Sequence, residues 1–120
     1  MTLDNDGALK LIIFLFEIKK RPLLFLKKKS MTQLSFIQIG FVFGYNNAKD
    51  YGLIEFYEKT KSGNIWSEFQ IYLSNKYDIH SLDDSELVSF CKSDEKAFDL
   101  FFEELEIFLK ENNIEIPEIE

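Results

Sequence analysis

The chain has 120 residues, of which 46% are hydrophobic and 29% are charged, and it contains 13 Phe but only one His and one Cys. This length and composition predict one globular domain and exclude a disordered chain, while one His and one Cys exclude a disulfide framework and a His/Cys zinc site within one chain. The 14 Lys and Arg against 21 Asp and Glu give a net charge of −7, which excludes strong nucleic-acid binding because phosphate neutralisation needs basic residues.

The first predicted element is a helix from about Asn5 to Arg21 that is apolar around most of its surface. Asp4 or Asn5 can cap its start, and Pro22 cannot continue a helix, so the helix should end at Arg21. Its apolar run, residues 8–18, is shorter than the roughly 20 residues that a membrane-spanning helix needs. We therefore expect a buried core helix, with a helix on a membrane surface as the alternative.

A connector over residues 22–29 should follow this helix. The apolar residues 23–26 are expected to lie against the core, and the lysines 27–29 are expected in solvent. Ser30 then opens the next helix, because Gln33 follows three residues later at the spacing of a capping box, in which the two side chains accept each other's backbone N–H groups.

The helix that Ser30 opens contains two glycines, Gly40 and Gly44, four residues apart on one face. Each Gly weakens a helix by roughly 1 kcal/mol relative to Ala, so a packing reason is expected. Without side chains at these positions another helix can approach closely. The exit of the helix is predicted at Asn46, Asn47 and Gly52.

Three shorter elements are predicted in the middle of the chain. Residues 53–59 favour a short helix, although seven residues do not distinguish a helix from a strand by periodicity. Residues 65–77 repeat apolar side chains at steps of three and four, which is typical of an amphipathic helix. An acidic loop and a short helix ending at Cys91 should follow, with a strand over residues 86–91 as the alternative.

The last predicted helix has the clearest pattern. Ser93 is its expected N-cap, and Asp94 and Glu95 occupy the first turn, where the helix dipole favours anions. One face is apolar and consists of Phe98, Phe101, Phe102, Leu105, Phe108 and Leu109. Beside it lies an acidic stripe of Asp99, Glu103 and Glu106, with Glu95 nearby. Residues 112–113 should end the helix, and residues 114–120 should form a frayed acidic tail.

All strongly periodic elements in this sequence are helical. We therefore predict an all-α, single-domain bundle of about five to six helices over residues 1–113, followed by the acidic tail over residues 114–120. The alternative fold class is α+β, with a small strand element around residues 53–59 or 86–91.

Charge is distributed unevenly along the chain. Residues 93–120 hold ten Asp and Glu against two Lys, a net charge of −8, so the rest of the chain sums to +1. The basic segment 19–29 can lie beside the acidic helix and partly neutralise it. The sharper interpretation is that the acid binds a cationic protein, and the simpler one is a solvated helix face. The candidate partner-binding residues are Glu95, Asp99, Glu103, Glu106, Asp83, Asp84 and Glu86.

No catalytic or metal motif is recognisable in the sequence. His80 lies in a polar loop without a defined partner, and Cys91 ends an apolar stripe, which is typical of a buried small hydrophobe. The acidic loop lacks the central Gly of an EF-hand, and the five Gly residues form neither a P-loop nor a dinucleotide fingerprint. We expect a non-enzyme without cofactor or metal. An unpaired Cys91 and the lack of a signal-peptide pattern predict a cytoplasmic location.

Two stretches resemble a loose group of small bacterial proteins linked to toxin–immunity systems. One is RPLLFL over residues 21–26, followed by Leu34, Phe36, Ile37 and Gly40, where the group tends to show Arg-Pro-Gly-Met, an aromatic residue and a glycine. The other is SDEKAFDLFF over residues 93–102, which is similar to the group's ending Asp-Glu-x-Ala-Phe-x-x-Phe-Phe. Residues 69–77 resemble its amphipathic middle helix, so the resemblance spans roughly residues 8–110.

The resemblance implies an immunity protein of the contact-dependent growth inhibition type, which binds and neutralises a sibling toxin, commonly a cationic nuclease. An acidic surface suits that role because complementary potentials raise the association rate. The expected partner is thus a cognate toxin domain, with no nucleic acid, membrane or small-molecule cofactor. The alternative function is an acidic cytoplasmic secretion chaperone or adaptor.

Overall fold

The structure is a computed structural model that describes residues 3–50, 65–77 and 84–115, leaving aside the side chains of residues 84 and 85. These residues form six α-helices and no strand. The helices are α1 (Asn5–Lys20), α2 (Pro22–Phe25), α3 (Met31–Asp50), α4 (Ile65–Tyr77), α5 (Asp84–Cys91) and α6 (Asp94–Glu111). The predicted all-α bundle is confirmed, and residues 86–91 are helical. The predicted element over residues 53–59 lies outside the described residues.

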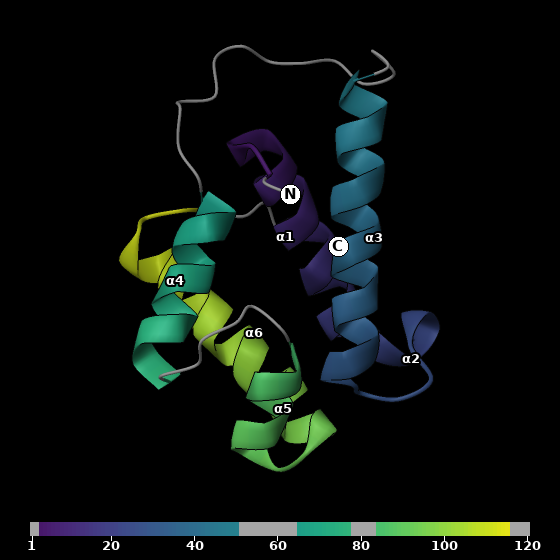
Figure 1. The fold of residues 1–120 in the computed structure, drawn as a ribbon, viewed down its shortest axis with the longest axis vertical. Helices are drawn as coiled ribbons and strands as arrows, with labels where there is room; N and C mark the ends of the chain where they lie inside the picture. Colours follow the sequence, from purple (N-terminus) through teal and green to yellow (C-terminus); the bar gives the residue numbers. More distant parts are fainter. Residues whose placement is uncertain (1–2, 51–64, 78–83, 116–120) are drawn as a thin grey trace.

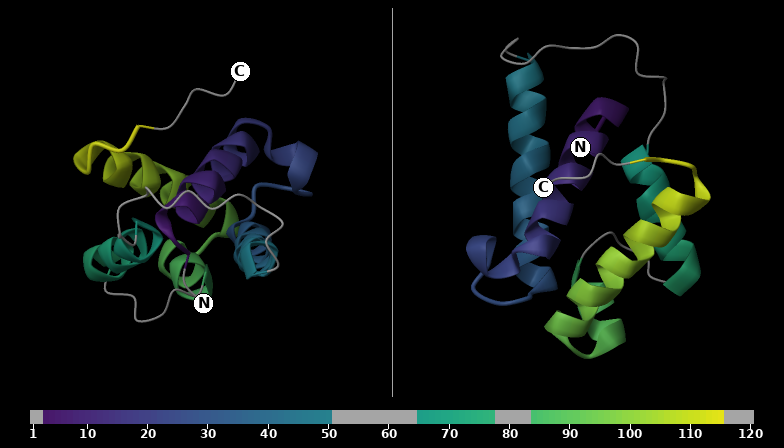
Figure 2. Two further views of the ribbon diagram at one scale, coloured as in Figure 1. Left: turned by 90° about the horizontal axis from the view of Figure 1, so that it is seen from above. Right: turned by 180° about the vertical axis from the view of Figure 1, so that it is seen from behind.

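Helix α1 lies in the middle of the molecule, between α3 on one side and the pair of α4 and α6 on the other (Figure 1). The views from above and from behind show the same order, with α5 at the end where α6 begins (Figure 2). Helices α1 and α3 run in opposite directions, as do α4 and α6. Helix α3 lies at one side of the bundle and contacts the other helices through one of its faces. Its opposite face therefore lies on the outside of the molecule.

The ends of α1 and α6 have the capping groups that the sequence predicts. The Asp4 carboxylate accepts a hydrogen bond of 2.7 Å from the backbone N–H of Gly7, and the Ser93 hydroxyl accepts one of 3.1 Å from Lys96. Helix α6 ends at Glu111 with Asn112 as its C-cap, and Asn113 has a positive φ of 55°, which is typical of the left-handed residue that follows a helix. The next residue, Ile114, packs partly buried against the core, so the predicted frayed tail is wrong at this position.

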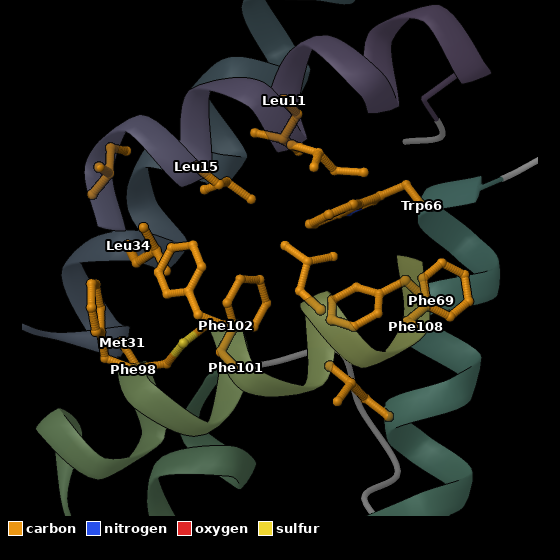
Figure 3. Packing of buried hydrophobic residues seen from close by; sticks show 14 of the residues in the cluster. Leu11, Leu15, Met31, Leu34, Trp66, Phe69, Phe98, Phe101, Phe102 and Phe108 are labelled. Carbon is orange, nitrogen blue, oxygen red and sulfur yellow. The ribbon is translucent and has the colours of Figure 1, made fainter. Parts of the chain in front are cut away.

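Aromatic side chains from α6 and α4 dominate the core (Figure 3). The six residues of the predicted apolar face of α6 are all buried. The Phe69 ring of α4 lies 5.6 Å from that of Phe101 and 5.4 Å from that of Phe108, measured between centroids. Phe102 faces the other way and lies 5.9 Å from Phe16 of α1. Helix α6 therefore joins α4 to α1, and the edge-to-face pair of Phe69 and Phe101 adds to the area burial at the α4 contact.

The connector after α1 differs from the prediction. Residues 22–25 form the short helix α2, because Pro22 has a backbone angle suited to the first position of a helix. This turn directs Leu23 and Leu24 into solvent, and Leu26 is the buried leucine of the connector. The expectation that all of residues 23–26 lie against the core is therefore wrong.

The predicted capping box at the start of α3 is half formed. The Ser30 hydroxyl accepts a hydrogen bond of 3.1 Å from the Gln33 N–H, as predicted. The Gln33 side chain, however, accepts a hydrogen bond of 3.0 Å from the backbone N–H of Lys27. Of the predicted exit residues, Asn46 and Asn47 still lie within α3, which continues to Asp50, and Gly52 lies outside the described residues.

The close helix approach expected at Gly40 and Gly44 does not occur within the described chain. Among the described residues, a Cβ atom added at either glycine would meet no heavy atom within 4 Å apart from its chain neighbours and the backbone of its own helix. The close approach lies at Gly7 instead, where an added Cβ would come within 2.7 Å of the Tyr45 ring. The face of α3 that carries Gly40 and Gly44 therefore points away from the bundle.

Candidate functional site

The predicted acidic residues of α6 form a continuous exposed stripe. Glu95, Asp99, Glu103 and Glu106 follow one another at steps of four, four and three residues, which keeps them within about a quarter of the helix circumference. All four are exposed, because the residues on the other side of α6 are buried in the core. We call these four residues the acidic stripe.

Basic residues from the first third of the chain lie beside this stripe. Lys19 at the end of α1 forms an ion pair with Glu106, and the Lys29 Nζ lies 3.9 Å from an Asp99 carboxylate oxygen. The predicted proximity of the basic segment 19–29 to the acidic helix is therefore confirmed. Exposed pairs of this kind contribute about 0–1 kcal/mol to stability, but they partly neutralise two carboxylates of the stripe.

The other two carboxylates remain open to a partner. Among the residues that the structure describes, no cation lies within ion-pair distance of Glu95 or Glu103. Glu95 also borders an open cleft of about 410 Å³ where α6 begins, lined in addition by Leu23, Lys28, Lys29, Ser93 and Asp94. Exposed carboxylates of this kind accept charge-assisted hydrogen bonds from Lys or Arg.

Asp94, which directly precedes Glu95, has a structural role. Its carboxylate accepts hydrogen bonds from the Ser30 hydroxyl, from the Thr32 N–H at 2.9 Å and from the Thr32 hydroxyl at 3.1 Å. Burial alone would raise the pKa of Asp94, but these hydrogen bonds outweigh it and lower the pKa. Asp94 therefore supplies an acceptor to the first turn of α3 and fixes the start of α6, including Glu95, against α3.

The remaining predicted site residues do not extend the stripe. Asp83 and the side chain of Asp84 lie outside the described residues. Glu86 lies on α5 and is half-buried. Of the seven predicted residues, the structure thus brings together the four on α6.

A buried carboxylate that the sequence analysis did not single out joins α4 to α6. Glu104 is 3% exposed and accepts hydrogen bonds of 2.7 Å from both the Tyr72 and the Tyr77 hydroxyls. The Lys76 Nζ lies 2.9 Å from the same carboxylate. A signal was present in the sequence: Glu104 lies three residues after Phe101 and four before Phe108, which places it on the buried side of the helix.

Hydrogen bonds hold Glu104 ionised although it is buried. Burial would raise its pKa, but the hydrogen bonds from Tyr77, Tyr72 and Lys76 outweigh burial and lower it. The same arrangement raises the pKa of Tyr77 to about 12, through burial and then the hydrogen bond to the carboxylate. Both carboxylate oxygens of Glu104 thus accept hydrogen bonds from within the protein. This cluster therefore holds α4 against α6 and leaves no free acceptor for a ligand.

The other candidate groups give no catalytic or metal site in the described part of the chain. Cys91 is half-buried, and burial raises the pKa of its thiol, which disfavours the reactive thiolate. His80 lies outside the described residues. Within residues 3–50, 65–77 and 84–115, no group of His, Cys, Asp and Glu side chains could hold a metal ion. No described helix is long and apolar enough to cross a membrane.

No protein-family model matches this chain, and neither curated proteins nor solved structures give a significant match.

Proposed function

We propose that this chain is an immunity protein that binds and neutralises a cognate bacterial toxin in the cytoplasm. The expected partner is a cationic toxin domain of the nuclease type, as in contact-dependent growth inhibition systems. The observation that carries the proposal is the acidic stripe of α6, on which Glu95 and Glu103 are exposed and have no ion-pair partner in the described chain.

The position of these carboxylates favours a rigid recognition surface. The apolar side of α6 is buried against α1 and α4, and Asp94 fixes its first turn to α3. The carboxylates therefore stand on a helix that does not need to fold on binding, which lowers the entropic cost of association. Complementary charge on such a surface raises the association rate and favours the correct partner.

The two halves of the stripe should contribute unequally. Asp99 and Glu106 already lie beside Lys29 and Lys19, so a toxin must compete with these lysines for them. Glu95 and Glu103 present no such competition. We therefore expect Glu95 and Glu103 to contribute most to toxin recognition.

The proposal is tested first by a pull-down with an inactivated form of the toxin domain encoded by the gene directly upstream. Association rates are then measured at low and high salt for the double variant Glu95→Gln/Glu103→Gln. The matched control, Asp99→Asn/Glu106→Gln, also removes two negative charges, but from the two carboxylates that already lie beside Lys29 and Lys19. We expect the first variant to bind several-fold more slowly than the control at low salt, with the difference shrinking at high salt. Equal rates for both variants and the wild type would contradict recognition through α6.

An acidic secretion chaperone or adaptor is the second candidate, favoured by the exposed apolar side chains Phe36, Ile39 and Phe43 of α3. A chaperone of that class captures an apolar segment of a secreted protein. It would then bind its partner through α3, and the charge-removing variants of α6 would bind at the wild-type rate.

A further inference from the structure

The outer face of α3 carries large apolar side chains in solvent. Phe36, Ile39 and Phe43 are 70%, 61% and 58% exposed, and Gly40 lies among them. No charged residue occurs from position 31 to position 48, and charge depletion is characteristic of interface cores. We propose that this face is the contact surface of a homodimer in which two copies of α3 pack antiparallel. This inference does not depend on toxin binding.

The spacing of the exposed residues favours a second copy as the occupant. Phe36 and Phe43 flank the central pair of Ile39 and Gly40 at equal distances of three residues, so an antiparallel copy can place the Phe at each end level with the Phe at the opposite end. In a two-fold contact the same surface is used on both subunits, so residue i of one copy meets residue j of the other and residue j meets residue i. In the antiparallel register, Phe36 of one copy lies level with Phe43 of the other, and Gly40 lies next to the two-fold axis.

The dimer gives a packing reason for the glycine that lies next to the two-fold axis, Gly40. Each Gly in a helix costs roughly 1 kcal/mol relative to Ala, and in the described part of one chain nothing beyond the neighbouring residues and backbone of α3 lies within 4 Å of a Cβ placed on Gly40. In the dimer, the absence of two Cβ atoms at the axis allows the two backbones to approach closely. The flanking phenylalanines then pack at either end of the contact.

The apolar area and the charges fit a dimer of moderate size. The three side chains expose on the order of 400 Å², about half of the roughly 800 Å² that each partner of a stable interface buries. At the two ends of α3, exposed Lys27 and Lys28 lie on one side and exposed Asp50 on the other. Antiparallel packing brings the basic end of each copy toward the acidic end of its partner.

Sedimentation of the full chain tests the dimer. The wild type should sediment at about twice 14.2 kDa at micromolar concentration, and Gly40→Leu should halve that mass. Gly40→Leu keeps the face apolar, and the new side chain has open space around it in the monomer. The variant should therefore disrupt a close helix–helix contact without weakening non-specific hydrophobic association. The matched control is Ile71→Glu, since Ile71 is similarly exposed on α4, and it should remain dimeric. A monomeric wild type, or a dimeric Gly40→Leu, would overturn the proposal.

Cross-linking tests the antiparallel register. Phe36→Cys and Phe43→Cys are made as separate proteins, each with Cys91→Ala, and are oxidised alone and as a mixture. We expect a disulfide-linked dimer in the mixture only, because position 36 faces position 43 of the other copy. Cross-linking of either protein alone would place like positions together and would contradict the register centred between Ile39 and Gly40.

Discussion

Helices α3 and α6 are the longest described helices, with 20 and 18 residues, yet they differ in how much apolar surface they bury. Helix α6 buries seven apolar residues and Glu104, whereas α3 buries three residues. In α6, acidic residues occupy the side next to the phenylalanines, so only one side can face the core. In α3, apolar residues occur around the whole helix, and the bundle covers only one side. An amphipathic helix thus forms a core and a polar surface together, whereas α3 leaves an apolar surface for a further contact.

The largest expected effect separates the buried face of α6 from the exposed face of α3. Phe101→Ala should lower the free energy of unfolding by about 3–5 kcal/mol, because the ring fills space among Trp66, Phe69 and Phe102. Phe36→Ala should change it by less than about 0.5 kcal/mol in dilute protein. Urea unfolding measures both values, and a loss below about 1 kcal/mol for Phe101→Ala would contradict its place in the core.

A smaller loss should distinguish two adjacent carboxylates of α6. Glu104→Ala leaves the Tyr72 and Tyr77 hydroxyls without their acceptor, so we expect a loss of about 2–3 kcal/mol. Glu103→Ala, one residue earlier and exposed, should stay within about 0.5 kcal/mol of the wild type. Similar values for the two variants would show that the Glu104 cluster does not hold α4 to α6.

The contribution of Glu104 should depend on pH in a defined direction. Its pKa in the folded protein lies below the usual value of 4.5, so the stabilisation is fully present above pH 4.5 and is lost as the pH falls through the lower, folded-state pKa. The stability difference between the wild type and Glu104→Gln should therefore be constant near neutral pH and shrink in acid. A difference that grows below pH 4.5 would contradict the assigned direction.

The smallest predicted effects compare two glycines. Gly7→Ala should destabilise the protein by about 1–3 kcal/mol, because the new Cβ would lie 2.7 Å from the Tyr45 ring, which hydrogen bonds from the Tyr45 hydroxyl to Asp4 hold in place. Gly44→Ala meets open space and should stabilise α3 by up to about 1 kcal/mol. Thermal unfolding of dilute protein should show a lower melting temperature for Gly7→Ala and a higher one for Gly44→Ala. A lower melting temperature for Gly44→Ala would show that this face of α3 is covered within the monomer.

The contrast between α6 and α3 also explains what could be predicted from the sequence. The buried face of α6, the bounds of α4 and the caps at Asp4 and Ser93 followed from periodicity and local hydrogen bonding, which depend on nearby residues. The orientation of α3 did not, because a helix without charged residues from 31 to 48 has no polar side to indicate solvent.

Contacts between distant segments were the least predictable part of the candidate site. The acidic stripe was predicted from residue spacing on one helix. The pairing of Lys19 with Glu106, and the hydrogen bonds between Thr32 and Asp94, depend on packing between helices that lie more than 60 residues apart in sequence. The charge imbalance along the chain indicated the approximate neighbours, but not which carboxylates would remain open.

The most direct test of the proposed function is survival of cells that produce the toxin domain encoded by the upstream gene. We expect the wild-type chain and Gly40→Leu to restore colony formation, because toxin recognition is assigned to α6 and not to α3. Glu95→Gln/Glu103→Gln should protect less at equal protein level. Failure of the folded wild-type chain to protect these cells would contradict the assignment as an immunity protein.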